Sequence, residues 1–109
     1  MKRIVFLSAA LALLACLPAQ AAWVVGQTLL QVGSGDAGGE YTWFQTAGTV
    51  DNPAGCGNTD IYIVRTLPKN ALAILLAGKL SGSPIRLFVH DTLCDSYTGR
   101  PLVKEVALQ

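Results

Sequence analysis

The side chains that most often do chemistry are few in this 109-residue sequence. His90 is its one histidine, and Asp91 beside it would point to the opposite face of a strand, which disfavours a Ser-His-Asp relay. Asp36, Glu40 and Asp51 could converge as paired carboxylates, but nothing in their spacing demands it. A metal site needs clustered ligands, which one histidine and scattered aspartates do not supply. We therefore expect a protein that is not an enzyme and that has no metal and no cofactor.

Aromatic residues give a better basis for a binding function. Tyr41, Trp43, Tyr62 and Tyr97 carry flat rings, three of which also bear a hydroxyl group, and polar residues such as Arg100 accompany them. Aromatic surfaces with nearby polar groups suit the recognition of sugars or peptides. Trp43 and Tyr62 lie in expected strands, so filling the core is an equally good interpretation for those two.

A glycine-rich segment, residues 33–38, matches the dinucleotide-binding pattern G-x-G-x-x-G. That motif must open a helix, whose N-terminus then holds the pyrophosphate. Residues 40–46 follow instead, and their aromatic and β-branched side chains favour a strand. We interpret the segment as a flexible hairpin loop and expect no nucleotide site.

The start of the chain has the form of a secretory signal peptide. Two basic residues precede an apolar run over residues 4–17, and Ala-Gln-Ala at residues 19–21 predicts cleavage after Ala21. The apolar run is shorter than the roughly 20 residues that a membrane-spanning helix needs. The alternative is a bacterial lipoprotein signal with a lipidated Cys16. We expect residues 22–109 to form one domain, secreted or periplasmic in a bacterium.

Charge and cysteine content narrow the partners and the compartment. Residues 22–109 carry six basic and seven acidic side chains, so there is no basic patch for nucleic acid. Cys56 and Cys94 are the cysteines left after cleavage, and an exported chain meets an oxidising compartment. We predict a disulfide between them, which would contribute about 4 kcal/mol of stability by closing a long loop.

Hydrophobic alternation and turn residues predict a mainly β fold with one helix. Pro68 should end the third strand, Asn70 should act as the helix N-cap, and Ser81 and Gly82 should end the helix. A helix between strands three and four is the order of an OB-fold, a five-stranded Greek-key barrel. The alternative is a small α+β sandwich. The expected strands are residues 23–32, 40–46, 61–67, 85–90 and 102–108, and the expected helix is residues 70–80.

The expected helix has no broad charged face. Leu72, Leu75, Leu76 and Leu80 gather on one side at 100° per residue, and Ile74 lies on the other side. One sheet covers one side of a helix, so Ile74 and the alanines beside it would need a second surface. This favours a homo-oligomer.

Several of these features together resemble a known family, the receptor-binding B subunits of subtilase-cytotoxin and pertussis-like toxins and their secreted homologues. The resemblance covers residues 56–108. It consists of Cys56 before a strand, the Leu/Ala helix, the Gly-Ser-Pro segment that leads into an alternating apolar strand, and then Cys94 and Pro101.

The resemblance implies a disulfide-bonded OB-fold that forms a ring of five and binds cell-surface glycans. It implies a ligand-binding serine near the first two strands, for which Ser34 is the candidate, with Tyr41 and Arg100 as further candidates. A secreted catalytic subunit is a partner of such proteins. The alternative function is a periplasmic structural or interaction protein without a sugar site.

Overall fold

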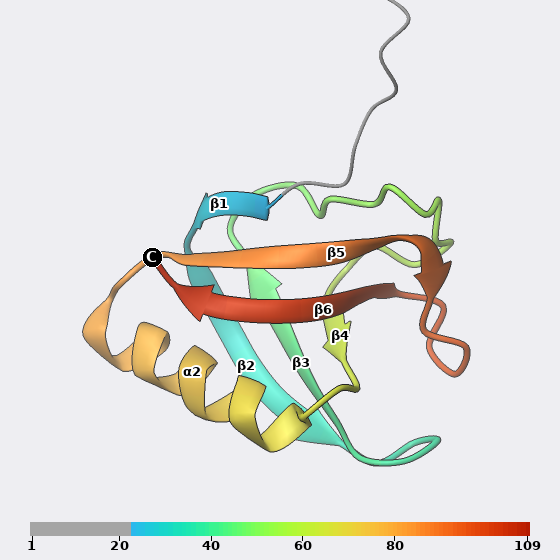
Figure 1. Cartoon of the computed structure of the whole chain (residues 1–109), viewed down its shortest axis with the longest axis horizontal. Helices are drawn as coiled ribbons and strands as arrows, with labels where there is room; N and C mark the ends of the chain where they lie inside the picture. Colours follow the sequence, from blue (N-terminus) through green and yellow to red (C-terminus); the bar gives the residue numbers. More distant parts are fainter. Residues whose placement is uncertain (1–22) are drawn as a thin grey trace, which may run out of the picture.

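The computed structural model describes residues 23–109, and the predictions of a signal peptide over residues 1–21 and of a lipidated Cys16 lie outside them. No helix within the described part is long and apolar enough to cross a membrane. The fold is mainly β with one helix, as predicted (Figure 1). Its elements in chain order are β1 (Trp23–Gln27), β2 (Leu29–Gly35), β3 (Tyr41–Thr46), β4 (Tyr62–Val64), α2 (Pro68–Ser81), β5 (Ile85–Cys94) and β6 (Pro101–Leu108).

All the strands belong to one sheet with the order β1-β5-β6-β4-β3-β2. Neighbouring strands are antiparallel except β4 and β6, which are parallel where Ile63 lies beside Leu102. Thr28 alone separates β1 from β2, although these strands form the two opposite edges of the sheet. The sheet therefore curls into a half-barrel, with β5 and β6 crossing over β2 and β3 (Figure 1).

The prediction of five strands is wrong, because the expected strand over residues 23–32 is two strands. The break has a local cause. Gly26 has a φ of 66°, a left-handed value that glycine adopts readily, and the pairing of β1 with β5 shifts register between Val24 and Gln27. The chain leaves β5 at this point and pairs with β3 after Thr28.

The junction between β4 and α2 also differs from the prediction. The third expected strand shrinks to Tyr62–Val64, and Leu67 takes a φ of 47° just before the helix. Pro68 starts the helix, where its missing N–H costs no hydrogen bond. Asn70 lies inside the first turn and is not the N-cap, and no side chain caps this end. The predicted C-terminus is confirmed, since Gly82 adopts a φ of 71° immediately after Ser81.

The core lies between the curled sheet and the helix. The two faces of β3 alternate, because Thr42, Phe44 and Thr46 are buried while the residues between them are half-buried on the other face. Leu75 of α2 is fully buried. Gly78 lets the helix approach closely, since a Cβ atom there would lie 3.1 Å from side-chain atoms of Ile85 and Leu108. The core cluster consists of Leu29, Phe44, Tyr62, Val64, Ala71, Leu75, Ile85, Leu87, Val89, Val103 and Val106.

The exposed side of α2 is not the side that the sequence predicted. Leu75 is buried, but Leu76 is 43% exposed and Leu80 is 87% exposed. Ile74 is half-buried and packs against the core, so its own subunit covers part of it, and the expectation of a second subunit over the rest stays a prediction. The large outward apolar side chains of the helix are Leu76 and Leu80, and the smaller Ala73 and Ala77 are exposed as well.

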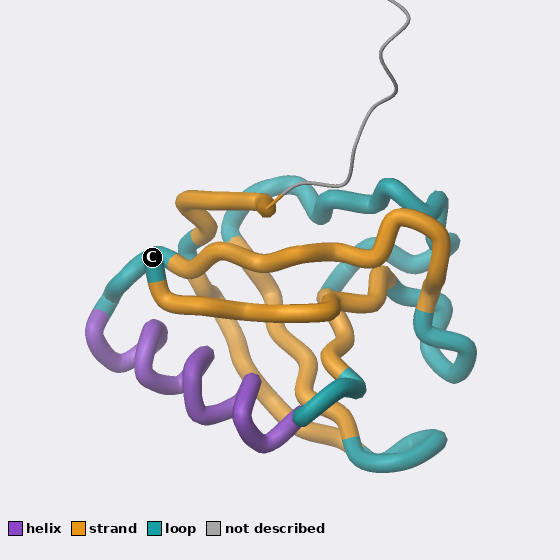
Figure 2. Tube along the Cα trace, viewed as in Figure 1, coloured by secondary structure: helices purple, strands orange, loops and turns teal. Residues whose placement is uncertain are grey.

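The predicted disulfide is confirmed. Cys56 and Cys94 are bonded, with their Cα atoms 5.7 Å apart. Cys56 lies in residues 47–61, the longest stretch without helix or strand in the described chain (Figure 2). Asn52 closes a local turn around it, accepting a hydrogen bond from the Cys56 N–H at 2.7 Å and donating one to the Cys56 carbonyl at 2.9 Å. The disulfide therefore links residues 47–61 covalently to the end of β5.

Candidate functional site

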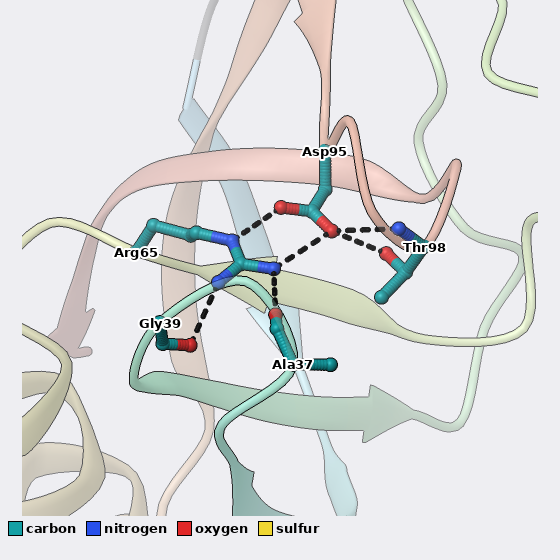
Figure 3. A network of polar contacts seen from close by, with 5 residues as sticks. All are labelled: Ala37, Gly39, Arg65, Asp95 and Thr98. Atoms are coloured by element: carbon teal, nitrogen blue, oxygen red, sulfur yellow. Dashed lines mark hydrogen bonds and ion pairs between the residues drawn. The ribbon is translucent and has the colours of Figure 1, made fainter.

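Two turns and the residue after β4 meet at one end of the sheet, and Arg65 holds them together (Figure 3). Its guanidinium donates to both carboxylate oxygens of Asp95, at 2.5 Å from Nε and 3.2 Å from Nη2. It also donates to the carbonyl oxygens of Gly39 at 2.9 Å and Ala37 at 2.8 Å. One side chain thus joins the β2–β3 turn to the β5–β6 turn.

Asp95 is the buried partner of this arginine, with only 3% of the residue exposed. It also accepts hydrogen bonds from the N–H of Thr98 at 2.9 Å and from the Thr98 hydroxyl at 2.7 Å. Burial raises the pKa of the Asp95 carboxyl, but the hydrogen bonds from Arg65 and Thr98 outweigh this and hold the pKa below its ordinary value. Asp95 is therefore ionised at neutral pH, and the turn that contains it is firmly held.

Two tyrosine rings lie against the same guanidinium. The Arg65 Cζ atom is 4.7 Å from the centre of the Tyr41 ring and 5.4 Å from that of Tyr97. Both distances fit cation–π contacts. Tyr97 is nevertheless 68% exposed. Its ring is therefore presented to solvent while the Arg65 guanidinium lies against it.

The glycine-rich segment explains how the rings can lie so close to the backbone. Gly33 and Gly35 belong to β2 and are not part of a flexible loop, contrary to the prediction. A Cβ atom at Gly35 would overlap the Tyr41 ring, and one at Gly38 would overlap the Tyr97 ring. The absence of a side chain at Gly35 and Gly38 therefore lets the two aromatic rings pack directly against the backbone. The segment leads into strand β3, not into the helix that a dinucleotide motif requires.

The three residues proposed from the sequence as ligand contacts do not all converge. Tyr41 lies against Arg65, as described above. Arg100 makes a two-point ion pair with Asp60 at 2.6 and 3.0 Å. Ser34 pairs with Thr42 in the sheet, so its side chain lies on the opposite face from that of Tyr41. The structure thus places Tyr41 against Arg65 and Arg100 against Asp60, and it leaves Ser34 apart from Tyr41.

We call the surface formed by Tyr41, Arg65, Tyr97 and Arg100 the tyrosine–arginine surface. The sequence points to Tyr41, Tyr97 and Arg100 but not to Arg65 or its partner Asp95. Arg65 and Asp95 are 30 positions apart, and no spacing or motif links them. They pair because the fold places the two turns side by side.

Two further groups that the sequence raises are the carboxylates and the single histidine. No three His, Cys, Asp or Glu side chains of residues 23–109 gather closely enough to hold a metal ion. His90 is half-buried, and burial together with the positive charge of Lys104 lowers its pKa.

Comparison with protein-family models, curated proteins and solved structures finds no match to this chain.

Proposed function

We propose that this chain is an exported, non-enzymatic binding module that recognises glycans through the tyrosine–arginine surface and works as a homo-oligomer. The observation that carries the proposal is the state of Tyr97, an exposed ring fixed in place by Gly38 beneath it and Arg65 beside it. An aromatic face stacks well on the apolar face of a sugar ring. A ring that is already fixed loses little conformational entropy when it binds.

Polar groups beside the ring fit the same ligand class. The Arg100–Asp60 pair is partly exposed and can exchange hydrogen bonds with sugar hydroxyls at either partner. The anchoring of both turns by Arg65 and Asp95 keeps these groups at constant distances. A preorganised polar and aromatic surface of this kind favours a small, polyhydroxylated ring over a flexible apolar ligand.

The arrangement of strands supports assigning the fold to the OB class. Counted as two halves of one strand, β1 and β2 reduce the sheet to five strands, with α2 between the third and the fourth. The single-residue link at Thr28 connects the two edges of the sheet, which favours a barrel over a sandwich. The resemblance of residues 56–108 to toxin B subunits supports both this fold and glycans as ligands.

A glycan array probed with the exported, disulfide-bonded protein tests the proposed ligand. We expect Tyr97→Ala to weaken binding to any glycan that the native protein retains by tenfold or more, which is about 1.4 kcal/mol. Tyr97→Phe keeps the ring and should bind nearly as well as the native protein. Val25→Ala removes an exposed side chain of β1, which contributes no residue to the tyrosine–arginine surface, and is the matched control. Binding that survives Tyr97→Ala unchanged, or an array without any retained glycan, contradicts the proposal.

Self-association is the second part of the proposal, and the exposed leucines of α2 support it. Leu76 and Leu80 present a contiguous apolar side of the helix, and within residues 23–109 β1 and β2 each have one unpaired edge. Contacts of this kind repeat around a closed assembly, and the family resemblance suggests a ring of five with a secreted catalytic subunit as partner.

Light scattering during size-exclusion chromatography tests the assembly. Leu80→Glu should dissociate it, whereas Leu93→Glu, which adds the same charge at the far end of β5, should not. A native protein that is monomeric at about 50 µM contradicts self-association.

The second candidate function, a periplasmic interaction protein without a sugar site, is favoured by the same exposed leucines. A stable assembly combined with a negative glycan array would support that alternative.

A further inference from the structure

A pocket of about 470 Å³ opens between α2 and the strands β1, β4, β5 and β6. We call it the helix pocket. None of the residues that define the tyrosine–arginine surface lines it. Its volume lies in the range of sites that bind small molecules, roughly 300–1,000 Å³.

The floor of the helix pocket is apolar. Val64, Ala71 and Val106 line it and are at most 9% exposed, and Ile74 lies beside them. An apolar group that entered the pocket would therefore meet hydrocarbon, with no buried polar group to desolvate on that side. Water in the pocket finds few hydrogen-bonding partners on the same floor, so its displacement favours binding.

The rim of the pocket is positively charged. Arg86 and Lys104 line it, and among residues 23–109 neither makes an ion pair. The two other arginines of the described chain are both paired with aspartates. Arg86 lies instead over the Trp23 ring, with its Cζ atom 4.9 Å from the ring centre, and the Lys104 ammonium lies 5.5 Å from the centre of the Phe88 ring. Both cations are thus available to an anion.

Two further features determine the net charge of a ligand that the rim would bind: Glu105 and the N-terminus of α2. Glu105 also lines the pocket, so the rim carries two positive charges and one negative charge. The first turn of α2 forms part of the wall, and it has neither an acidic residue nor a side-chain cap to offset the positive end of the helix dipole. A ligand with one negative charge matches this balance.

We propose that the helix pocket binds a small amphipathic carboxylate, with its apolar body on the Val64 and Val106 floor and its carboxylate between Arg86 and Lys104. The Trp23 indole forms the adjacent wall, where it excludes water from the carboxylate end. This site is separate from the tyrosine–arginine surface, and it requires neither glycan binding nor self-association.

Titration of the exported, disulfide-bonded protein by two-dimensional NMR tests the proposal with three probes of equal chain length: octanoate, 1-octanol and octylammonium. Octanoate should shift the amide signals of the pocket residues and bind most tightly, octanol more weakly, and octylammonium most weakly. Equal binding of octylammonium and octanoate, or no shift of pocket signals with any probe, overturns the proposal.

Substitutions identify the groups that hold the carboxylate. Arg86→Gln and Lys104→Gln should each weaken octanoate binding by about threefold to tenfold and leave octanol binding unchanged. Glu105→Gln should tighten octanoate binding, because it removes the competing negative charge. Lys79→Gln, at the distant end of α2, is the matched control and should change nothing. Loss of octanoate affinity in the control, or weaker binding in Glu105→Gln, overturns the assignment of the carboxylate to this rim.

A final variant separates this site from the proposed glycan site. Tyr97→Ala should keep full octanoate affinity, whatever its effect on glycan binding. Loss of octanoate binding in that variant would mean that the two sites are not independent, and it would overturn this proposal without bearing on the glycan test.

Discussion

The two arginine–aspartate pairs of this fold have similar geometry but differ in burial, and this difference predicts very different effects on stability. Asp95 is only 2% exposed at its side chain, whereas Asp60 is 54% exposed. Asp95→Asn keeps the shape but removes the charge, and it turns one carboxylate oxygen into an N–H donor. Whichever way the amide is oriented, a donor from Arg65 or Thr98 is left facing another donor.

Removing one partner of a buried, hydrogen-bonded pair costs about 3–5 kcal/mol, and we expect Asp95→Asn to lie near 3 kcal/mol because it retains some acceptors. Asp60→Asn is the matched control, since it makes the same substitution in an exposed pair worth about 0–1 kcal/mol. Urea unfolding followed by tryptophan fluorescence, with the disulfide intact, measures both. For a domain of this size, the midpoint should fall by about 2 M for Asp95→Asn and by less than 1 M for Asp60→Asn.

Acid adds an independent check on the same carboxylate. The pKa of Asp95 in the folded protein lies below its ordinary value of 3.8, so the unfolded chain takes up the proton first as the pH falls. The contribution of Asp95 is complete above about pH 5 and is lost as the pH falls through 3.8 towards the folded pKa. The difference in the free energy of unfolding between the native protein and Asp95→Asn should therefore be smaller at about pH 2.5 than at neutral pH. Equal midpoints for the two variants at neutral pH, or a stability difference that does not narrow in acid, would refute this account of the Arg65–Asp95 pair.

Three further predictions concern packing, the disulfide and the start of the mature chain. Gly78→Leu should destabilise the fold by about 1–3 kcal/mol, because a side chain there overpacks the contact with β5 and β6. Ala77→Leu, on the exposed side of the helix, is the control and should change stability by less than about 0.5 kcal/mol. Equal effects of the two variants in urea unfolding would contradict the close approach of the helix to the sheet. Replacing both Cys56 and Cys94 by alanine should cost about 4 kcal/mol, measured in the same assay, and a loss below about 1 kcal/mol would show that the bond constrains the unfolded chain very little. Mass spectrometry of the exported protein should find an N-terminus cut after Ala21, and a lipid mass on the chain would establish the lipoprotein alternative.

Features that depend on neighbouring residues were predictable from the sequence. Alternation along β3 predicted which of its residues share a face, because side chains of a strand alternate between two faces, but it did not show that the face of Phe44, and not that of Trp43, meets the core. The glycine after Ser81 correctly predicted the end of α2, since it takes the left-handed conformation that ends a helix. The pairing of Cys56 with Cys94 followed from the presence of only two cysteines after the expected cleavage site.

The rotation of α2 was not predictable, because the helix is apolar on all sides. Its sequence contains no polar face to mark the side that meets water, and close packing at Gly78 decided which leucines face the core. The split of the first strand likewise depended on where β5 and β3 lie, since the residues on both sides of Thr28 favour a strand equally well.

The sequence by itself determined the secondary-structure content, the end of the helix, the faces of β3 and the disulfide, since each depends on local conformational preference or on the count of a residue type. Only the tertiary structure decided that Arg65 pairs with Asp95, that Tyr97 lies on Gly38, and that Arg86 and Lys104, which make no ion pair among residues 23–109, line the pocket beside α2. These contacts join residues far apart in the chain, and they form only where the curled sheet brings its turns and edges together. Their free energies depend on burial and on the distances between charges, which no local pattern of residues encodes.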